Sequence, residues 1–217
     1  VMAMGDFDLS VGAMASLAGV VAAVTFGTTG SVTLGIFAAF AAGIAGGFLN
    51  GFLVSYVSIL PFVATLGTMT VFSGLAFITS GGKTLFGASI PAAFSGIAKG
   101  GIPLAEGLML PNLTLLAMAV LLVTFVFLEH TITGRRIYAI GGNSEAARLA
   151  GVRVRYLRCL AFGASGLGAA AAGLMYASRV ASANPTQGAG LMLDAIAAVF
   201  LGMTMSEEGE PRVLYTL

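Results

Sequence analysis

The sequence predicts an all-α protein: a polytopic transmembrane helix bundle of about five spans plus one short broken or re-entrant helix. Residues 9–82 contain no Asp, Glu, Lys, Arg or His, and a soluble domain of this size cannot hide so long an apolar run. Charged residues make up 9% of the chain, against about 25% in an ordinary soluble domain. The apolar stretches do not alternate with period two, so we expect helices and not the strands of a barrel.

Five spans are expected, because a bilayer core about 30 Å thick takes roughly 20 apolar residues per helix. In chain order they are residues 9–26, 32–56, 61–79, 113–128 and 157–178. A sixth apolar segment, residues 193–205, is too short to span unaided. Turn chemistry predicts breaks at residues 27–30, 58–61 and 81–111, where glycine, proline and small polar residues gather.

Small residues recur at every fourth position along two of these helices. The second expected helix carries one such row, and the fifth carries another: Gly35, Ala39, Gly43, Gly47 and Gly51, and then Ser165, Ala169, Gly173 and Ala177. Small residues let helix backbones approach closely, which is how helices associate in lipid. We therefore expect both rows to lie in helix–helix contacts.

Charge orients the spans. Six of the ten basic residues lie in one connector, residues 129–158: Arg135, Arg136, Arg148, Arg153, Arg155 and Arg158. By the positive-inside rule this connector is cytoplasmic, and the loop of residues 81–110 then lies on the periplasmic side. Counting back through three spans places Asp6 and Asp8 on the cytoplasmic side, unless one helix is broken or re-entrant.

The connector carries the most specific local chemistry of the chain. Asn143 or Ser144 is placed to cap a two-turn helix, Glu145 lies in the first turn, where the helix dipole favours an anion, and Gly151 ends the helix. A solvated loop whose arginines only fix topology is the alternative. That alternative explains the arginines but not a capped helix between glycines.

The predicted connector helix is built from small residues. Ala146, Ala147 and Ala150 expose little side chain, so the groove of another protein can approach this helix closely. The neighbouring arginines can then pair with carboxylates of that partner. We therefore expect the helix to dock on another protein.

Three segments resemble the permease subunits of bacterial ABC importers of the ribose, xylose, arabinose and galactose type. They are residues 5–12 (GDFDLSVG), residues 134–151 of the connector, and residues 193–199 (LDAIAAV) with Gly202. The resemblance implies a multi-pass protein of the bacterial inner (plasma) membrane that translocates a ribose-like monosaccharide by alternating access. Permeases of this family are longer, so we expect residues 1–217 to be a partial transmembrane permease domain.

The same resemblance implies partners and a coupling site. The partners are a cytoplasmic ABC ATPase subunit, a periplasmic sugar-binding protein and a second permease copy in the lipid bilayer. The element Glu-Ala-Ala-x-x-x-Gly at residues 145–151 resembles the cytoplasmic helix that docks on the ATPase. The ATPase-coupling loop is accordingly assigned to Gly134, Arg135, Gly141, Asn143, Glu145, Ala146, Ala147 and Gly151.

Four polar residues are candidates for the translocation path: Asp8, Ser10, Asn50 and Asp194. Ionisable groups within apolar sequence are usually functional or paired. Asp194 either lines the path or caps the following helix, with Arg179 as a candidate ion-pair partner. Asp8 precedes an apolar helix at capping distance, so a cap is favoured over substrate contact. Asn50 faces the path or hydrogen-bonds a neighbouring helix, the more usual role.

Several function classes are not supported. Gly82-Lys83-Thr84 ends like a phosphate-binding loop, but Phe77 stands where that loop needs glycine, so we expect ATP to be used by a partner and this chain to be neither an enzyme nor a cofactor binder. No His and Cys cluster has metal-ligand spacing. A net charge of +1 gives no reason to expect a nucleic-acid partner.

Two alternative transport functions stay open. A permease for branched-chain amino acids would have a similar connector and an equally apolar bundle, although residues 8–12 favour a sugar. An ion-coupled secondary transporter would show ionisable residues in mid-span and inverted repeats. Only Asp194 is placed to serve that mechanism.

Overall fold

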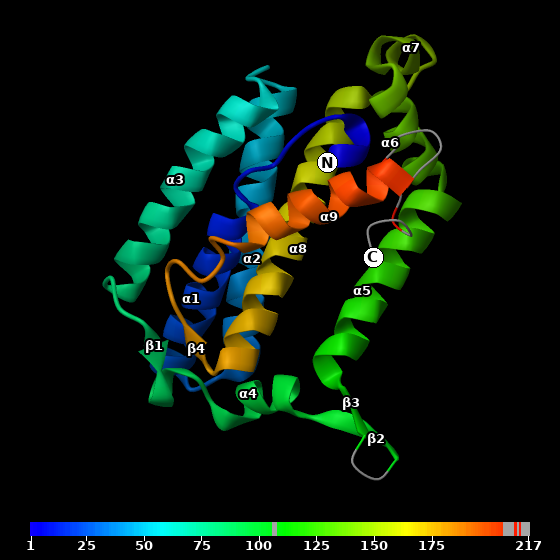
Figure 1. Ribbon diagram of the computed structural model, residues 1–217. Coiled ribbons are helices and arrows are strands. Elements are labelled where there is room, and N and C mark those ends of the chain that lie inside the picture. The colour runs from blue at the N-terminus through cyan, green and yellow to red at the C-terminus, as the bar shows by residue number, and fades with distance from the viewer. Residues whose placement is uncertain (106–107, 206–210, 212, 214–217) are drawn as a thin grey trace.

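The computed structural model describes residues 1–105, 108–205, 211 and 213, and within them it is a bundle of α-helices (Figure 1). Five helices are long and apolar enough to cross a membrane: α1 (Val11–Thr29), α2 (Val32–Ser55), α3 (Pro61–Ser80), α5 (Asn112–His130) and α8 (Val154–Val180). A shorter apolar helix, α9 (Leu191–Met205), follows them. The predicted fold class is confirmed.

Short elements lie at the two ends of the bundle. They are the 3-10 helices η1 (Met2–Met4) and η2 (Gly87–Ser89), the strands β1 (Leu85–Phe86), β2 (Gly101–Ala105), β3 (Leu108–Pro111) and β4 (Ser182–Ala183), and the helices α4 (Ala92–Lys99), α6 (Ile132–Gly142) and α7 (Ser144–Leu149). We call the end with the α2–α3 turn, α6, α7 and the start of α8 the connector end. The end with α4 and the β2–β3 hairpin is the hairpin end (Figure 1).

The helix boundaries follow from the residues that occupy them. Gly30 and Gly81 follow α1 and α3 with φ angles of 69° and 62°, the left-handed conformation that favours glycine at a helix C-terminus. The hydroxyl of Ser31 accepts a hydrogen bond from the Leu34 backbone N–H and so caps α2. Pro61 begins α3, where its fixed φ suits the first turn.

Helices α2 and α8 pack with their backbones in contact. A Cβ atom at Gly43 or Gly47 would overlap the backbone carbonyl of Gly166 or Phe162, and one at Gly51 would overlap the backbone of Cys159. The glycine row predicted on α2 is therefore a packing surface. Any larger side chain there would push the two helices apart.

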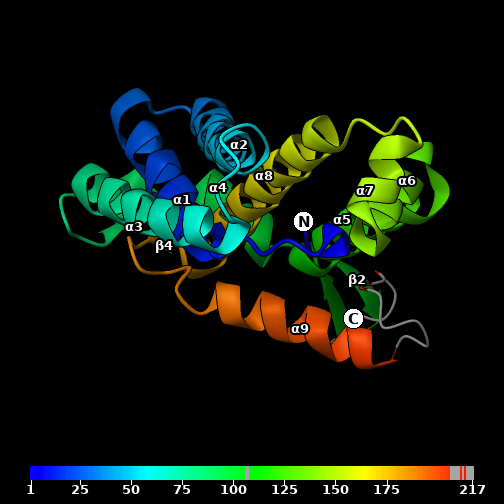
Figure 2. The ribbon, with the colours of Figure 1, turned by 90° about the horizontal axis from the view of Figure 1, so that it is seen from above.

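The row predicted on α8 faces a different neighbour. A Cβ atom at Gly173 would overlap the backbone of Ala15 in α1, and Ala169 lies in one buried cluster with Met14 and Leu17 of that helix. Thus α8 shows one small-residue surface to α2 and another to α1. Among the five membrane-length helices α1 is the most buried, and α8 packs against both α1 and α2 (Figure 2).

The hairpin end is closed by α4 and by a short strand pair. The rings of Phe26 in α1 and Phe94 in α4 lie 4.8 Å apart, and the Ser178 hydroxyl of α8 donates a hydrogen bond to the Phe94 carbonyl at 2.7 Å. Strand β1 pairs antiparallel with β4, which joins the segment after α3 to the segment after α8.

The chain between β4 and α9 turns back into the bundle, whereas the segment expected to be broken or re-entrant, residues 193–205, lies in the continuous helix α9. Gly12 and Gly188 lie so close that a Cβ atom on either would overlap the carbonyl of the other. The Gly188 N–H donates a hydrogen bond of 2.8 Å to the buried hydroxyl of Ser16. From there α9 runs across the outside of the bundle (Figure 2).

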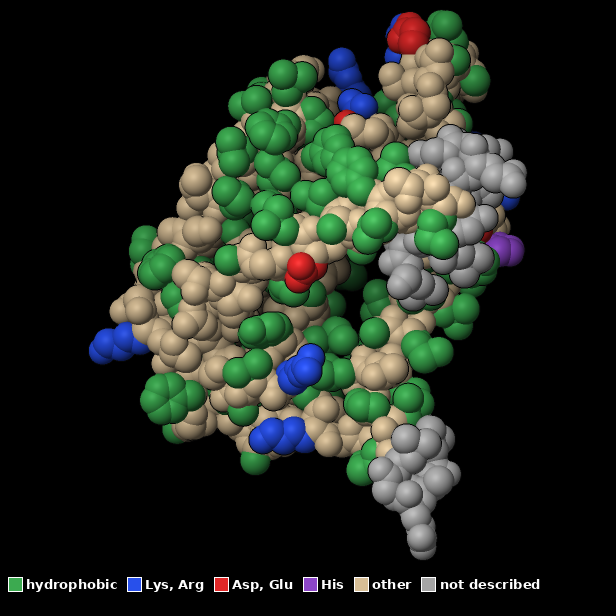
Figure 3. Space-filling model, viewed as in Figure 1, with side chains coloured by type: hydrophobic (Ala, Val, Ile, Leu, Met, Phe, Trp, Pro, Cys, Tyr) green, Lys and Arg blue, Asp and Glu red, His purple; other side chains and the backbone are tan. Residues whose placement is uncertain are grey.

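Helix α5 stands apart from the other spans. None of its residues is buried within the described chain, and its neighbours are α4, α6 and β3. Apolar side chains also dominate the face of the bundle seen in Figure 3. Such a surface suits lipid or further protein and not water.

Replacing Gly47 with Leu should break the α2–α8 contact, because the new side chain would occupy the position of the Phe162 carbonyl. We expect a loss of at least about 1 to 3 kcal/mol in the free energy of unfolding, measured as a fall in Tm in detergent. Gly67→Leu on α3 is the matched control, since a Cβ atom there meets nothing within 4 Å. Equal Tm values for the two variants would contradict the packing role of Gly47.

Candidate functional site

The connector forms two helices whose positions depend on glycine. A Cβ atom at Gly134 would overlap the carbonyls of Phe127 and Leu128, so glycine lets α6 fold back against the end of α5. A Cβ atom at Gly141 would overlap the carbonyl of Ala3, so glycine lets η1 rest on α6. Both glycines belong to the predicted coupling loop, and each allows a close backbone contact that a larger residue would prevent.

Helix α7 begins and ends where the sequence predicts. The Asn143 side chain accepts a hydrogen bond from the Ala146 backbone N–H at 2.9 Å, which identifies Asn143 and not Ser144 as the N-cap. Gly151 has a φ angle of 84°, and its N–H donates to the Arg148 carbonyl at 3.0 Å. The connector therefore presents a short, firmly bounded helix at the connector end (Figure 1).

Glu145 and Arg148 form an ion pair on the open side of α7. Arg148 Nε donates to Glu145 Oε2 at 3.0 Å, and a second hydrogen bond joins Arg148 Nη2 to Glu145 Oε1. These hydrogen bonds and the guanidinium charge lower the pKa of Glu145. Both side chains are 64% exposed, so the pair adds little to stability and stays free to meet a partner. Arg135 on α6 is also exposed.

The two alanines of α7 and the alanine at its C-cap do not share one face, contrary to the expectation that all three are open to a partner. Ala147 is buried and packs with Ile140 and Leu157, because it lies on the side of α7 that faces α6 and α8. Ala146 and Ala150 are exposed. The sequence reading missed Leu149, which is 77% exposed and gives α7 an apolar tip.

Asp6 ties the N-terminal segment to the start of α8. Its Oδ2 atom lies 2.7 Å from Arg158 Nε, an ion pair without the in-line geometry of a hydrogen bond. Burial raises the pKa of Asp6, and the charge of Arg158 opposes that shift. Asp6 thus lies at the connector end, on the same side as the connector arginines, as the sequence analysis expected.

A chain of hydrogen bonds joins three of the four predicted path residues. Asp8 Oδ1 accepts from the backbone N–H and the hydroxyl of Ser10 at 3.0 and 2.7 Å. Asn50 Nδ2 donates to the Ser10 hydroxyl at 2.8 Å. Two further side chains extend the network: Ser165 donates to Asp8 Oδ2 at 2.7 Å, and Thr68 donates to Asn50 Oδ1 at 2.6 Å.

The network connects α1, α2, α3 and α8. Asn50 is fully buried, and it hydrogen-bonds neighbouring segments, the role that the sequence analysis favoured for it. Asp8 does not occupy the N-cap position, which belongs to Ser10, but it binds the Ser10 N–H from two residues earlier. These polar groups satisfy one another inside an apolar bundle.

Asp194 lies outside this network. It is the fourth residue of α9, so it is not the N-cap of that helix, and its side chain is exposed. Within the described residues it forms no ion pair with Arg179, so the expected pairing is wrong. The helix dipole accounts for an acid in this first turn.

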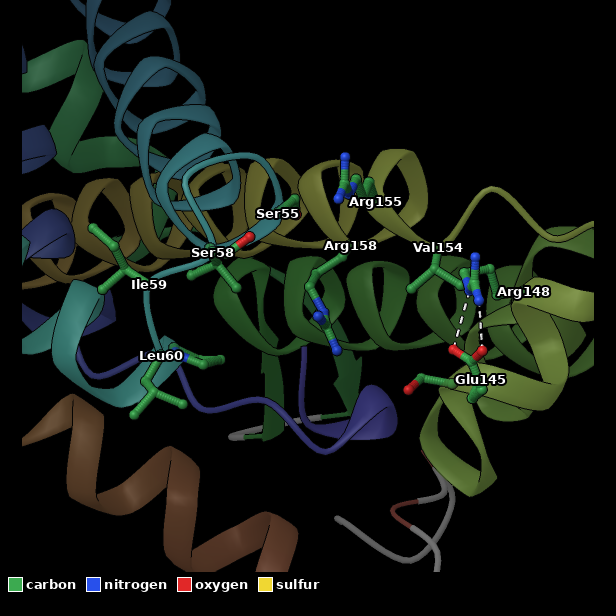
Figure 4. A pocket seen from close by; sticks show the side chains of 12 residues that line it. Ser55, Ser58, Ile59, Leu60, Glu145, Arg148, Val154, Arg155 and Arg158 are labelled. Atoms are coloured by element: carbon green, nitrogen blue, oxygen red, sulfur yellow. Dashed lines mark hydrogen bonds and ion pairs between the residues drawn. The ribbon is translucent and has the colours of Figure 1, made fainter.

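A groove of about 310 Å³ opens at the connector end between the α2–α3 turn, α7 and the start of α8 (Figure 4). Arg148, Arg155 and Arg158 line it together with Ser55 and Glu145. The sequence analysis missed this groove, because its walls come from segments about 90 residues apart along the chain.

A family model described as the permease component of the branched-chain amino acid transport system matches residues 1–212. The chain belongs to this permease family. With its five membrane-length apolar helices among the described residues, it is a multi-pass protein of the inner membrane.

Curated relatives cover the whole chain. It is 41% identical over 220 residues to the ribose import permease protein of Bacillus subtilis (strain 168), and 40% identical over 216 residues to the L-arabinose transport system permease protein of Escherichia coli (strain K12). Each alignment covers 100% of this permease, and respectively 66% and 64% of the relative. The chain thus spans about two thirds of the length of these relatives. No solved structure matches it.

Replacing Asp8 with Ala should destabilise the permease, because three hydrogen bonds to a carboxylate are lost and the buried Ser10 loses its acceptor. We expect a loss of about 2 to 3 kcal/mol, measured as a fall in Tm in detergent. Asp194→Ala is the control, since that exposed side chain should change stability by less than about 0.5 kcal/mol. Similar losses in both variants would contradict the assignment of the network to Asp8.

Proposed function

We propose that this permease is the membrane-spanning subunit of a binding-protein-dependent ABC importer that moves a monosaccharide across the inner membrane. The observation that carries the proposal is the match of the whole chain to relatives named for ribose and L-arabinose import. A periplasmic sugar-binding protein delivers the substrate, and two permease copies form the path. Transport then proceeds by alternating access.

Hydrolysis of ATP is assigned to a separate cytoplasmic subunit that docks on α7. This assignment is supported by the surface of the helix, where Glu145, Arg148 and Leu149 are exposed while Ala147 anchors the other side. An ion pair beside an apolar tip is a surface that a protein groove can recognise by charge and by shape. The remaining assigned coupling residues, Gly134, Arg135, Gly141, Asn143, Ala146 and Gly151, shape or flank this helix.

The way in which force from α7 reaches the path follows from the packing of α8. Ala147 of α7 packs against Leu157 in the first turn of α8, and Ser165 lies about two turns further along the same helix. A displaced α7 therefore moves the helix that holds Asp8. Helices α1, α2 and α8, which meet through backbone contacts, then shift as packed bodies.

A monosaccharide is favoured over a branched-chain amino acid as the substrate. The family description names branched-chain amino acids, whereas the relatives that match the whole chain carry the names of sugars. Uptake by the full-length permease with its ATPase and binding protein tests this choice. We expect transport of labelled ribose or arabinose and none of leucine. Uptake of leucine alone would overturn the sugar assignment.

Reversing the charge of Glu145 should uncouple the permease from its ATPase. Glu145→Lys places a cation beside Arg148 and reverses the charge that a partner meets, while the exposed position leaves the fold intact. We expect association with the ATPase to weaken about tenfold, measured by co-purification, and uptake to fall with it, as for the loss of an interfacial charge pair.

The control for this variant is a charge reversal at the other end of the bundle. Lys99→Glu changes an exposed cation at the end of α4, at the hairpin end. It should leave association with the ATPase unchanged. If Glu145→Lys keeps full association and uptake, α7 is not the docking element.

A further inference from the structure

The groove at the connector end has an excess of positive charge. Three arginines line it, and two carboxylates offset them: Glu145 pairs with Arg148, and Asp6 pairs with Arg158 from behind. Arg155 has no hydrogen-bond or ion-pair partner among the described residues. Its charge is therefore available to an anion in the groove.

A buried hydroxyl in the wall of the groove also lacks a partner. Ser55 is 4% exposed, and its Oγ atom makes no hydrogen bond to any of the described residues. Buried hydroxyls are almost always hydrogen-bonded, and an unmade bond costs free energy. Ser55 is the last residue of α2 and lines the groove together with Arg155 and Arg158 of α8 (Figure 4). An anion bound between them would accept the missing hydrogen bond.

The position of the groove matches the headgroup layer of a bilayer. It lies where α2 ends, and where α3 and α8 begin, so it sits at the membrane boundary of three spans. The positive-inside rule places this boundary in the cytoplasmic leaflet. Leu60, which lines the groove, and the neighbouring Phe62 and Val63 are 71%, 57% and 55% exposed. These side chains offer apolar surface to acyl chains that hang below a headgroup.

We infer that this groove binds the phosphodiester headgroup of an anionic phospholipid of the cytoplasmic leaflet. Arg155 and Arg158 hold the phosphate oxygens, the Ser55 hydroxyl donates to one of them, and the acyl chains run along the start of α3. Basic pockets between spans on the cytoplasmic side are the usual sites for such headgroups. The bound lipid joins the α2–α3 turn to the start of α8, beside α7.

An acidic side chain of a partner protein is the competing occupant. The apolar side chains beside the groove favour the lipid, because Leu60, Phe62 and Val63 at the start of α3 can contact its acyl chains, which an acidic side chain lacks. The lipid proposal depends on the side assigned to the connector end but not on the substrate, and it shares Glu145 and Arg148, which line the groove, with the proposed ATPase-docking surface. Its test therefore measures lipid binding and not transport.

The test titrates lipids into the purified, delipidated full-length permease in neutral detergent and follows Tm. Phosphatidylglycerol should raise Tm in a saturable way, and phosphatidylcholine should not. Arg155→Gln should weaken the apparent affinity for phosphatidylglycerol about fivefold, the effect of one arginine near an anionic membrane surface. Arg153→Gln removes the same charge two residues away, outside the groove, and should leave that affinity unchanged.

Four outcomes would overturn the inference. They are equal responses to the two lipids, equal losses in the two arginine variants, an equal Tm rise with inorganic phosphate alone, and a loss of ATPase association in Arg155→Gln with unchanged lipid affinity. The third would assign the groove to a free phosphate anion, and the fourth would assign it to a carboxylate of the partner.

A second variant examines the hydroxyl. Ser55→Ala should raise the Tm of the lipid-free permease slightly, because it removes a buried polar atom without a partner. The same change should weaken the affinity for phosphatidylglycerol. Unchanged affinity in this variant would show that the headgroup does not reach Ser55, and would overturn the proposed geometry.

Discussion

The close contact between the backbones of α2 and α8 is the constraint on which the rest of the structure depends. In lipid there is little hydrophobic force between helices, so association relies on tight packing at small residues. Gly43 and Gly47 of α2 provide it by meeting the carbonyls of Gly166 and Phe162. With α8 fixed in this way, α1 packs against another face of α8, and α7 packs against its first turn. The position of the connector helix is thus set from within the bundle.

A buried polar network also fixes the relative orientation of the packed helices. Tight contacts between small residues fix how near two helices lie, whereas hydrogen bonds also fix which atoms face each other. Asn50 has one partner at the start of α1 and another on α3, and Asp8 has a partner on α8. Four segments must therefore be in place before these polar groups are satisfied. This dependence favours one arrangement of the helices over others of similar packing.

The sequence predicts the spans and the limits of α7 well, because hydropathy, Gly30, Pro61, Asn143 and Gly151 act locally. It predicts poorly which faces meet. The row predicted on α8 packs on α1, and the row that meets α2 includes Gly166, one residue beyond Ser165 of that prediction. The sequence did not predict the burial of Ala147, the position of Asp194 outside the polar network or the groove at the connector end, and the reason is the same for all three. Each depends on how distant segments cross, which no local pattern encodes.

The N-terminal segment is attached to α8 at two depths. Asp6 binds Arg158 near the membrane boundary, and Asp8 binds Ser165, seven residues and about 10 Å further along the helix axis. Two attachment points on one rigid rod remove the freedom to pivot that a single point would leave. The stretch before α1 is therefore held to α8 in a fixed orientation and forms one rigid unit with it.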